Sequence, residues 1–332
     1  MSEVNSSISR VAASLVVAGA ALLGVNAGQA QNTYPDRPIR LIVPFPPGGQ
    51  TDNVSRRLSV TIAPILGQQL IIDNRSGAAG TIGSGEAARA KPDGYTLLMA
   101  TASTHAISPT MLSNIPYDAL KDFAPITVIG TGPMTISVHP SVPARTLMQL
   151  VADVKAHPGK YSYGSAGVGS IVHLGGELFK LRAGKLEILH VPYKGAGPVM
   201  QELVGGQIEM ACTSLSAALP HHRSGRVRTL AVMKEERSVS APDIPTIVEA
   251  GVPGAITYTY NMLLAPAGTS RSVIAYLSGT MTKVMADRAF IDTLIKLGVE
   301  PITDSNPDKA EAMLKAELGR WSPIIEALGL RQ

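Results

Sequence analysis

Residues 40–57 read RLIVPFPPGGQTDNVSRR, and the pattern of this stretch returns along the rest of the chain. The apolar run of residues 41–45 predicts a strand, and the Pro-Pro-Gly-Gly of residues 46–49 ends that strand. Beyond the loop, Val54, Leu58 and Ile62 follow one another at helical spacing. The stretch therefore predicts a strand, a glycine loop and the start of a helix.

A loop of this kind is suited to bind an anion. The first N–H groups of a helix have no partner within the helix, and the helix dipole places about half a positive charge there. A carboxylate held by Phe45, Gly48 and Gly49 is the ligand that this arrangement favours. A plain turn between strand and helix is the alternative, and the loop residues alone do not separate the two.

The same alternation continues after the first helix. Strands are predicted over residues 70–72 and 95–100, with a helix over residues 81–90 between them, and this order predicts a parallel sheet. Thr101 and Ser103 follow the third strand, at the sheet edge where ligands of open α/β sheets bind. We take both as candidate hydroxyl donors to a ligand, with ordinary helix capping as the alternative.

A second glycine-rich loop occupies residues 164–170 and again stands between a strand and a helical pattern. Ser165, Gly169 and Ser170 of this loop are candidates for ligand contact, by the argument that applies to the first loop.

The strand predicted over residues 187–191 is followed by two further candidates, Tyr193 and Lys194. Lys194 supplies a charge for a second carboxylate, and a solvated lysine at the rim is the alternative. Capping boxes at Thr146 and Thr246 predict two helix starts. Other strands are predicted over residues 161–163, 208–212 and 227–232, and helices over residues 270–285, 288–297 and from 306 past Trp321.

The order of elements predicts two domains. Residues 126–138 read as one or two strands that leave the first unit, Pro140 to Arg145 mark the crossing, and residues 257–264 read as the return. We therefore predict one domain from residues 31–139 with 262–332, and a second from residues 140–261.

The first thirty residues predict a secretory signal peptide. Arg10 precedes an apolar run over residues 11–25, and small residues at positions 28–30 place the cleavage after Ala30. A membrane anchor is the alternative, but the run is shorter than the roughly 20 residues of a spanning helix. The prediction is an exported, periplasmic protein.

Composition and charge argue against nucleic acid as a partner and against an intramolecular disulfide. The chain has 29 Lys+Arg and 25 Asp+Glu, and removal of Arg10 and Glu3 with the signal leaves the net charge at +4. These charges are scattered and aromatic residues make up 4%, a pattern that does not favour nucleic acid as a partner. Cys212 is the single cysteine, so no intramolecular disulfide forms.

Several motifs carry a resemblance to a known family. They are YPDRPIRLIVPFPPGG at residues 34–49 with Asp52, PDGY at 92–95, DFAP at 122–125, HVPYKG at 190–195 and PAGT at 266–269. In this order and spacing the chain resembles the substrate-binding proteins of tripartite tricarboxylate transporters, the Bug or TctC-like receptors. The resemblance covers essentially the whole chain after residue 33.

The resemblance implies an α/β, two-domain periplasmic binding protein of type II, a Venus flytrap in which each domain is a mostly parallel sheet flanked by helices. It also implies a ligand carboxylate held between the two glycine loops, partly through water, and an integral-membrane permease driven by an ion gradient as partner. We expect a monomer without metal or cofactor. The chain departs from the family pattern at residues 260–262, Tyr-Asn-Met, so the hinge or the pocket lining is expected to differ there.

Other readings remain open or are disfavoured. Asp52 either caps its helix or receives an ammonium or hydroxyl group of the ligand. The same receptor fold also suits a sensor for a two-component kinase. A dinucleotide-dependent enzyme is disfavoured, because residues 46–49 do not form G-x-G-x-x-G. His173 and Glu177 are four residues apart on one helix, but two ligands are too few for a metal site.

Overall fold

The computed structural model describes residues 34–331. The chain divides into a short unit of residues 1–36 and a large one of residues 37–332, and the account below concerns the large unit. The predicted signal peptide and its cleavage site lie outside the described residues. Among those that are described, no helix is both long and apolar enough to cross a membrane.

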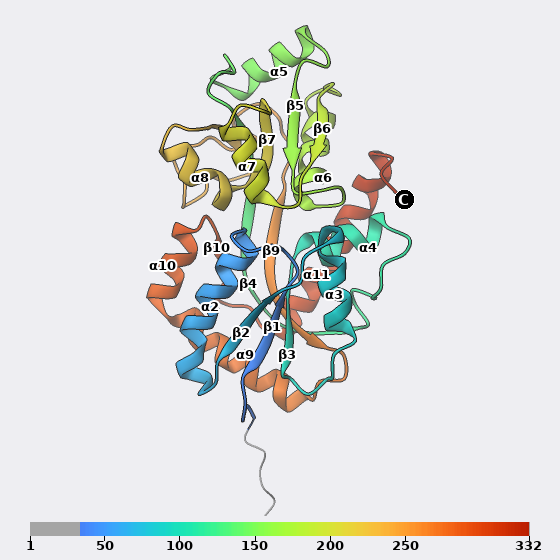
Figure 1. Ribbon diagram of the computed structural model, residues 1–332, viewed down its shortest axis with the longest axis vertical. Helices are drawn as coiled ribbons and strands as arrows, with labels where there is room; N and C mark the ends of the chain where they lie inside the picture. Colours follow the sequence, from blue (N-terminus) through green and yellow to red (C-terminus); the bar gives the residue numbers. More distant parts are fainter. Residues whose placement is uncertain (1–33, 332) are drawn as a thin grey trace, which may run out of the picture. The chain divides into compact units, whose positions relative to one another are not determined.

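The described strands form one mixed sheet in the order β2-β1-β3-β9-β4-β7-β5-β6, with β8 and β10 paired to β4 (Figure 1). The pairs β1–β2, β1–β3, β5–β6 and β5–β7 are parallel, and the pairs of β4 and β9 are antiparallel. The strands are β1 (Ile39–Val43), β2 (Leu70–Asn74), β3 (Thr96–Ala100), β4 (Phe123–Val138), β5 (Ser162–Ser165), β6 (Leu189–Pro192), β7 (Met210–Ser214), β8 (Arg228–Val232), β9 (Tyr258–Pro266) and β10 (Glu300–Pro301).

The long strand β4 divides the sheet into two parts. It pairs with β9 as far as Pro133 and with β7 and β8 from Met134 onward. We call the part around β1, β2 and β3 lobe 1, and the part around β5, β6 and β7 lobe 2. Strand β4 thus changes its pairing strands at residues 133 and 134, several residues before the crossing segment that was predicted from Pro140 to Arg145. The predicted domain boundaries themselves stay a prediction.

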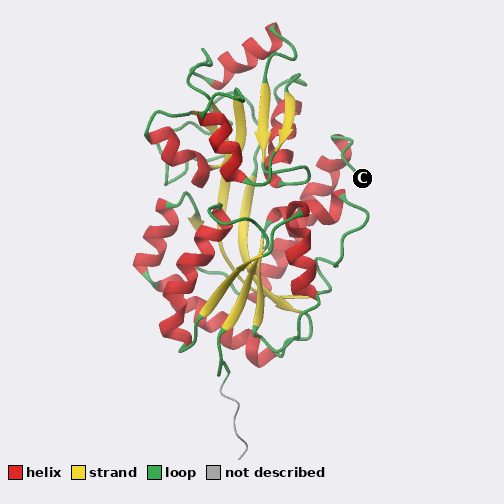
Figure 2. Ribbon diagram, viewed as in Figure 1, coloured by secondary structure: helices red, strands yellow, loops and turns green. Residues whose placement is uncertain are grey.

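Helices cover the sheet in both lobes (Figure 2). In lobe 1, α2, α9 and α10 contact one another, and α11 contacts α4 and β4. The helices are α2 (Gln50–Leu66), α3 (Thr81–Ala88), α4 (Ser108–Met111), α5 (Leu147–Ala156), α6 (Ile171–Arg182), α7 (Ala196–Val204), α8 (Leu215–Arg223), α9 (Arg271–Ala286), α10 (Arg288–Lys296) and α11 (Pro307–Ala327), with a 3-10 turn η1 (Ala78–Gly80) and a π-helical segment η2 (Ser103–Ile107).

Both predicted capping boxes are present, but a regular helix follows only the first. At Thr146 the side chain accepts from the Gln149 N–H, the Gln149 side chain accepts in return, and α5 follows as predicted. At Thr246 the same exchange with Glu249 is present, but no regular helix follows, so that prediction was wrong. Gly251, with φ of 89°, ends the segment after about one turn.

The core confirms the predicted apolar positions. Val54, Leu58 and Ile62 of α2 are at most 1% exposed, and each buried aliphatic side chain of this size stabilises the fold by about 1.5–3 kcal/mol. Cys212 is fully buried in β7. Gly67, in the left-handed conformation, ends α2.

Candidate functional site

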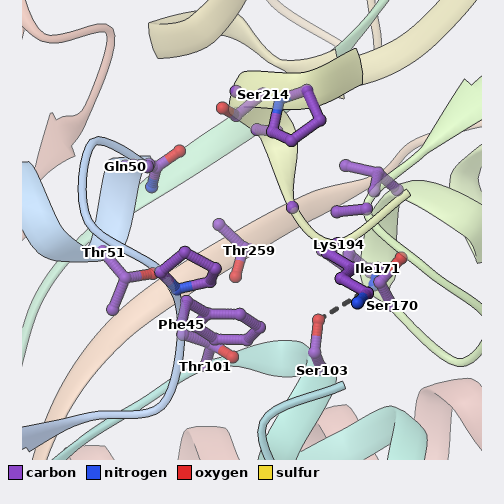
Figure 3. Close-up of a pocket in the computed structure, with 18 of the residues that line it drawn as sticks. Phe45, Gln50, Thr51, Thr101, Ser103, Ser170, Ile171, Lys194, Ser214 and Thr259 are labelled. Atoms are coloured by element: carbon purple, nitrogen blue, oxygen red, sulfur yellow. Dashed lines mark hydrogen bonds between the residues drawn. The ribbon is translucent and has the colours of Figure 1, made fainter. Parts of the chain in front are cut away.

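A cavity of about 120 Å³ lies between residues of the two lobes (Figure 3). Its walls come from the loops before α2, α6 and α7, from the residues that follow β3, and from the stretches of β4, β7 and β9 near the crossing. The lining residues are Phe45, Pro46, Pro47, Gly49, Gln50, Thr51, Thr101, Ser103, Met134, Ala166, Ser170, Ile171, Val172, Lys194, Gly195, Ala196, Gly197, Pro198, Ser214 and Thr259.

The first glycine loop presents the start of α2 to this cavity. Gly49 is the residue before the helix, has no side chain to cap it, and adopts an extended conformation. The first amide with a backbone partner is that of Asn53, which donates to the Gly49 carbonyl at 3.0 Å. No described residue accepts from the N–H groups of Gln50 and Thr51, so they are open to an anionic ligand.

The second glycine loop is already occupied by hydroxyl groups. Ser170 accepts from the His173 N–H at 3.3 Å, and Ser103 Oγ accepts from the Ile171 N–H at 3.0 Å (Figure 3). The Ser103 bond joins lobe 1 to lobe 2. The N-terminus of α6 therefore contributes to lobe contact as well as to the cavity wall.

A third loop precedes α7; Tyr193 and Lys194 at its start were site candidates, whereas its glycines were not. Gly195 stands before the helix with φ of 129°, a conformation that favours glycine. A Cβ at Gly195 would lie 3.4 Å from Pro46 Cγ, so this loop meets the first glycine loop directly. The signal was the Gly-Ala-Gly-Pro of residues 195–198, in which proline stands at the third helical position.

Six of the predicted site residues line the cavity: Phe45, Gly49, Thr101, Ser103, Ser170 and Lys194. The other five do not: Gly48, Asp52, Ser165, Gly169 and Tyr193. The loops before α2, α6 and α7 each contribute residues to both groups, and the role of these residues in binding stays a prediction.

Asp52 holds the first loop in shape. It is 1% exposed and accepts hydrogen bonds from the Gly48 N–H at 2.9 Å, from Asn74 Nδ2 at 2.9 Å and from Arg56 Nε at 2.8 Å. Burial would raise the pKa of the Asp52 carboxyl, but these hydrogen bonds outweigh it and lower the pKa below its ordinary value. The arrangement favours the structural role of Asp52 over contact with a ligand.

Ser165 and Gly169 belong to a network behind the second loop. Ser165 Oγ lies 2.6 Å from His190 Nε2, and the Gly169 N–H donates to His173 Nδ1 at 3.3 Å. The two imidazole rings stack with centroids 4.3 Å apart. Burial, and then the neighbouring His173, lower the pKa of His190 to about 4, so both rings are neutral at neutral pH.

Glu177 is not paired with His173 for metal binding. Its carboxylate accepts from the Tyr163 hydroxyl at 2.7 Å and from Lys180 at 2.9 Å. Within residues 34–331, no group of three or more His, Cys, Asp and Glu side chains is placed to hold a metal ion.

Two buried polar groups of the cavity wall lack partners. Thr101 is 1% exposed and Gln50 is 7% exposed, and neither Thr101 Oγ1 nor Gln50 Nε2 has a hydrogen-bond partner within residues 34–331. Gln50 Oε1 accepts from Ser216 Oγ of lobe 2 at 3.4 Å. The sequence reasoning missed Gln50, because its position depends on Gly132, where a Cβ would lie 2.2 Å from Nε2.

The departure at residues 260–262 lies beside the cavity. Thr259 lines it, whereas Tyr260, Asn261 and Met262 do not. All three are fully buried, and the Tyr260 hydroxyl and both polar atoms of the Asn261 amide have no hydrogen-bond partner.

This combination of a lobe-spanning cavity and an open helix N-terminus can be compared with known proteins. The sequence pattern described as "Tripartite tricarboxylate transporter family receptor" matches residues 54–330. The chain belongs to this receptor family. Its members are substrate-binding receptors, periplasmic in location, and are not enzymes.

Individual members of the receptor family align over most of their length. Protein BugT of Bordetella pertussis is 35% identical over 312 residues, which cover 94% of this chain and 95% of BugT. A solved R. palustris protein with adipate is 33% identical with a TM-score of 0.86, covering 89% of this chain and 98% of its own. MatC from Rhodopseudomonas palustris with bound malate is 30% identical with a TM-score of 0.83, covering 88% of this chain and 100% of its own.

Proposed function

We propose that this receptor binds a small organic carboxylate in the cavity between its lobes and delivers it to an ion-gradient-driven permease of the tripartite tricarboxylate type. The observation that carries the proposal is the open N-terminus of α2, whose Gln50 and Thr51 amides have no partner at a cavity that also holds Lys194. A carboxylate satisfies unpaired N–H groups at a helix N-terminus and complements the lysine.

The relatives support the same class of ligand. The two solved proteins described above hold adipate and malate, and both molecules are carboxylates. Export by the predicted signal peptide would place the receptor in the periplasm, where a permease can read the liganded form. Closure of the lobes around the ligand, with bending near residues 133–134 and 257–264, would provide that signal.

The proposal is tested by a thermal-shift panel on the mature protein, unfolded and refolded to remove any carried ligand. The panel holds dicarboxylates, tricarboxylates, amino acids, aromatic acids and sugars, with NAD and ATP as controls. A carboxylate at a hundred times its dissociation constant adds about 2.7 kcal/mol of stability. A response to NAD or a sugar alone would overturn the proposal.

Replacement of Gly49 tests the loop directly. Gly49→Asp introduces a carboxylate at the residue before α2, where its oxygen can cap the open amides, and the nearest atom to the new Cβ is the Pro46 carbonyl oxygen at 3.9 Å. We expect a folded protein that no longer binds carboxylates. Gly49→Ala is the matched control, since it adds the Cβ without the charge and should keep affinity within about threefold. Equal affinity in both variants would remove this loop from the site.

Delivery needs its own measurement. Uptake of the radiolabelled carboxylate into vesicles that contain the permease subunits should require the receptor and an ion gradient, and no ATP.

A further inference from the structure

We infer that the carboxylate ligand of this receptor carries no ammonium group and has an apolar body about the size of a six-membered ring or a short alkyl chain. The inference rests on the proposed function and narrows the ligand class within it. Three properties of the cavity support it: its charges, its apolar wall and its size.

The cavity offers nothing to balance a positive group. Among the twenty described lining residues, Lys194 is the one charged side chain, and there is no aspartate or glutamate. The nearest acid along the chain, Asp52, is outside the lining, and its oxygens already accept from Gly48, Arg56 and Asn74. An ammonium group would enter a site with a lysine and no counter-ion, and burial of an unpaired charge is strongly unfavourable.

The unpaired polar groups of the wall also select oxygen. Gln50 Nε2 is a buried donor without an acceptor, and the open amides of α2 are donors as well. Thr101 Oγ1 is able to donate to the same ligand. These donors complement carboxylate oxygens. An ammonium group is itself a donor, so it would meet other donors in place of acceptors.

Nearly half of the lining residues are apolar, and, besides Thr101, five others, Thr51, Ser103, Ser170, Ser214 and Thr259, carry hydroxyl groups. Nine of the twenty lining residues are Phe, Met, Ile, Val, Ala or Pro, namely Phe45, Pro46, Pro47, Met134, Ala166, Ile171, Val172, Ala196 and Pro198. A multiply charged body would lose its hydration against the nine apolar residues, whereas each buried methylene strengthens binding about fourfold.

The size of the cavity limits the body. About 120 Å³ is slightly less than the roughly 150 Å³ of a protein cavity that binds benzene. A body of about six carbon atoms fits this space, and the carboxylate extends from it toward the start of α2.

The experiment compares acids that differ in one group, by titration calorimetry on the refolded mature protein. One set holds hexanoate, adipate and 6-aminohexanoate, and the other holds benzoate and 4-(aminomethyl)benzoate, with malate, citrate and glutamate beside them. We expect an acid with an apolar body to bind, and its amino counterpart to bind at least about 100-fold more weakly.

Two results would overturn the inference while the proposed function stands. One is binding of an amino counterpart within tenfold of its parent acid, and the other is binding of malate, citrate or glutamate alone. If no carboxylate binds in this set or in the thermal-shift panel, the proposed function itself fails.

Discussion

Replacement of Asp52 by asparagine separates a structural role from a ligand-binding one. The change removes the charge and keeps the shape. Asp52 Oδ2 accepts from the Gly48 N–H and from Arg56, and Oδ1 accepts from Asn74, so an asparagine amide nitrogen faces a donor in either orientation. Asn74 cannot turn to compensate without cost, because its Nδ2 also donates to the Phe45 carbonyl at 3.0 Å.

The expected loss follows from these contacts. A buried hydrogen bond to a charged group contributes about 1.5–3 kcal/mol, whereas the Arg56 pair contributes at most about 1 kcal/mol because the Arg56 side chain is 54% exposed. We therefore expect Asp52→Asn to lower the free energy of unfolding by about 2–4 kcal/mol. Ligand affinity should change less than about tenfold, since Asp52 does not line the cavity.

Urea unfolding followed by circular dichroism measures the stability, and calorimetry with the best carboxylate measures the affinity. Arg56→Gln is the matched control and should cost less than about 1 kcal/mol. A variant as stable as the parent that has lost its ligand would refute the reasoning and make Asp52 a ligand contact.

Three further predictions concern the rest of the fold and the cavity. Below pH 6.5 an unfolded histidine takes up a proton that His190, with its pKa near 4, does not, so stability should fall from pH 7 to pH 5. In urea titrations His190→Asn should reduce that fall by up to about 2 kcal/mol, and an unchanged fall would contradict the assignment. Thr146→Ala removes the Thr146 half of the capping box and should lower the free energy of unfolding by about 1 kcal/mol in the same urea titrations; an unchanged free energy of unfolding would contradict a stabilising role of the box. Gly132→Ala displaces the Gln50 amide and should weaken carboxylate binding in calorimetry about as much as Gln50→Ala, with little added effect in the double variant; additive losses would disconnect the two positions.

Local patterns predicted most of the regular structure. The apolar stripe of α2 and Gly67 at its end specify that helix without reference to the rest of the molecule. Several short elements were missed for local reasons as well, among them α8 and β10. Helix α8 begins directly at the end of β7 and contains Pro220, and β10 is two residues long, so neither shows a clear period. At Thr246 a correct capping signal was cut short by Gly251.

Six of the twenty residues that line the cavity were predicted as site residues, and several of the others were missed because their positions depend on distant parts of the chain. Met134 and Thr259 line the cavity where β4 and β9 pass from one lobe to the other, and nothing near them in sequence marks that point. Gln50 is held in place through Gly132 in β4 and Ser216 of lobe 2. Contacts between residues so far apart in the sequence leave no periodic pattern in it.

In the proposed site, backbone amides would recognise the charge of the ligand and side chains would recognise its body. The open backbone donors described for this cavity are the amides at the start of α2, and a glycine loop before a helix is their sequence signature. In the proposed site such loops would fix where the carboxylate binds, whatever body is attached to it. The body of the ligand would instead contact side chains such as Phe45, Met134 and Ile171, which come from both lobes and would select among bodies. Two relatives with the same fold hold adipate and malate, one with an apolar body and one with a hydroxylated body. The wall of this cavity, which lacks an acidic side chain and is rich in apolar ones, therefore matches the first kind of ligand better than the second.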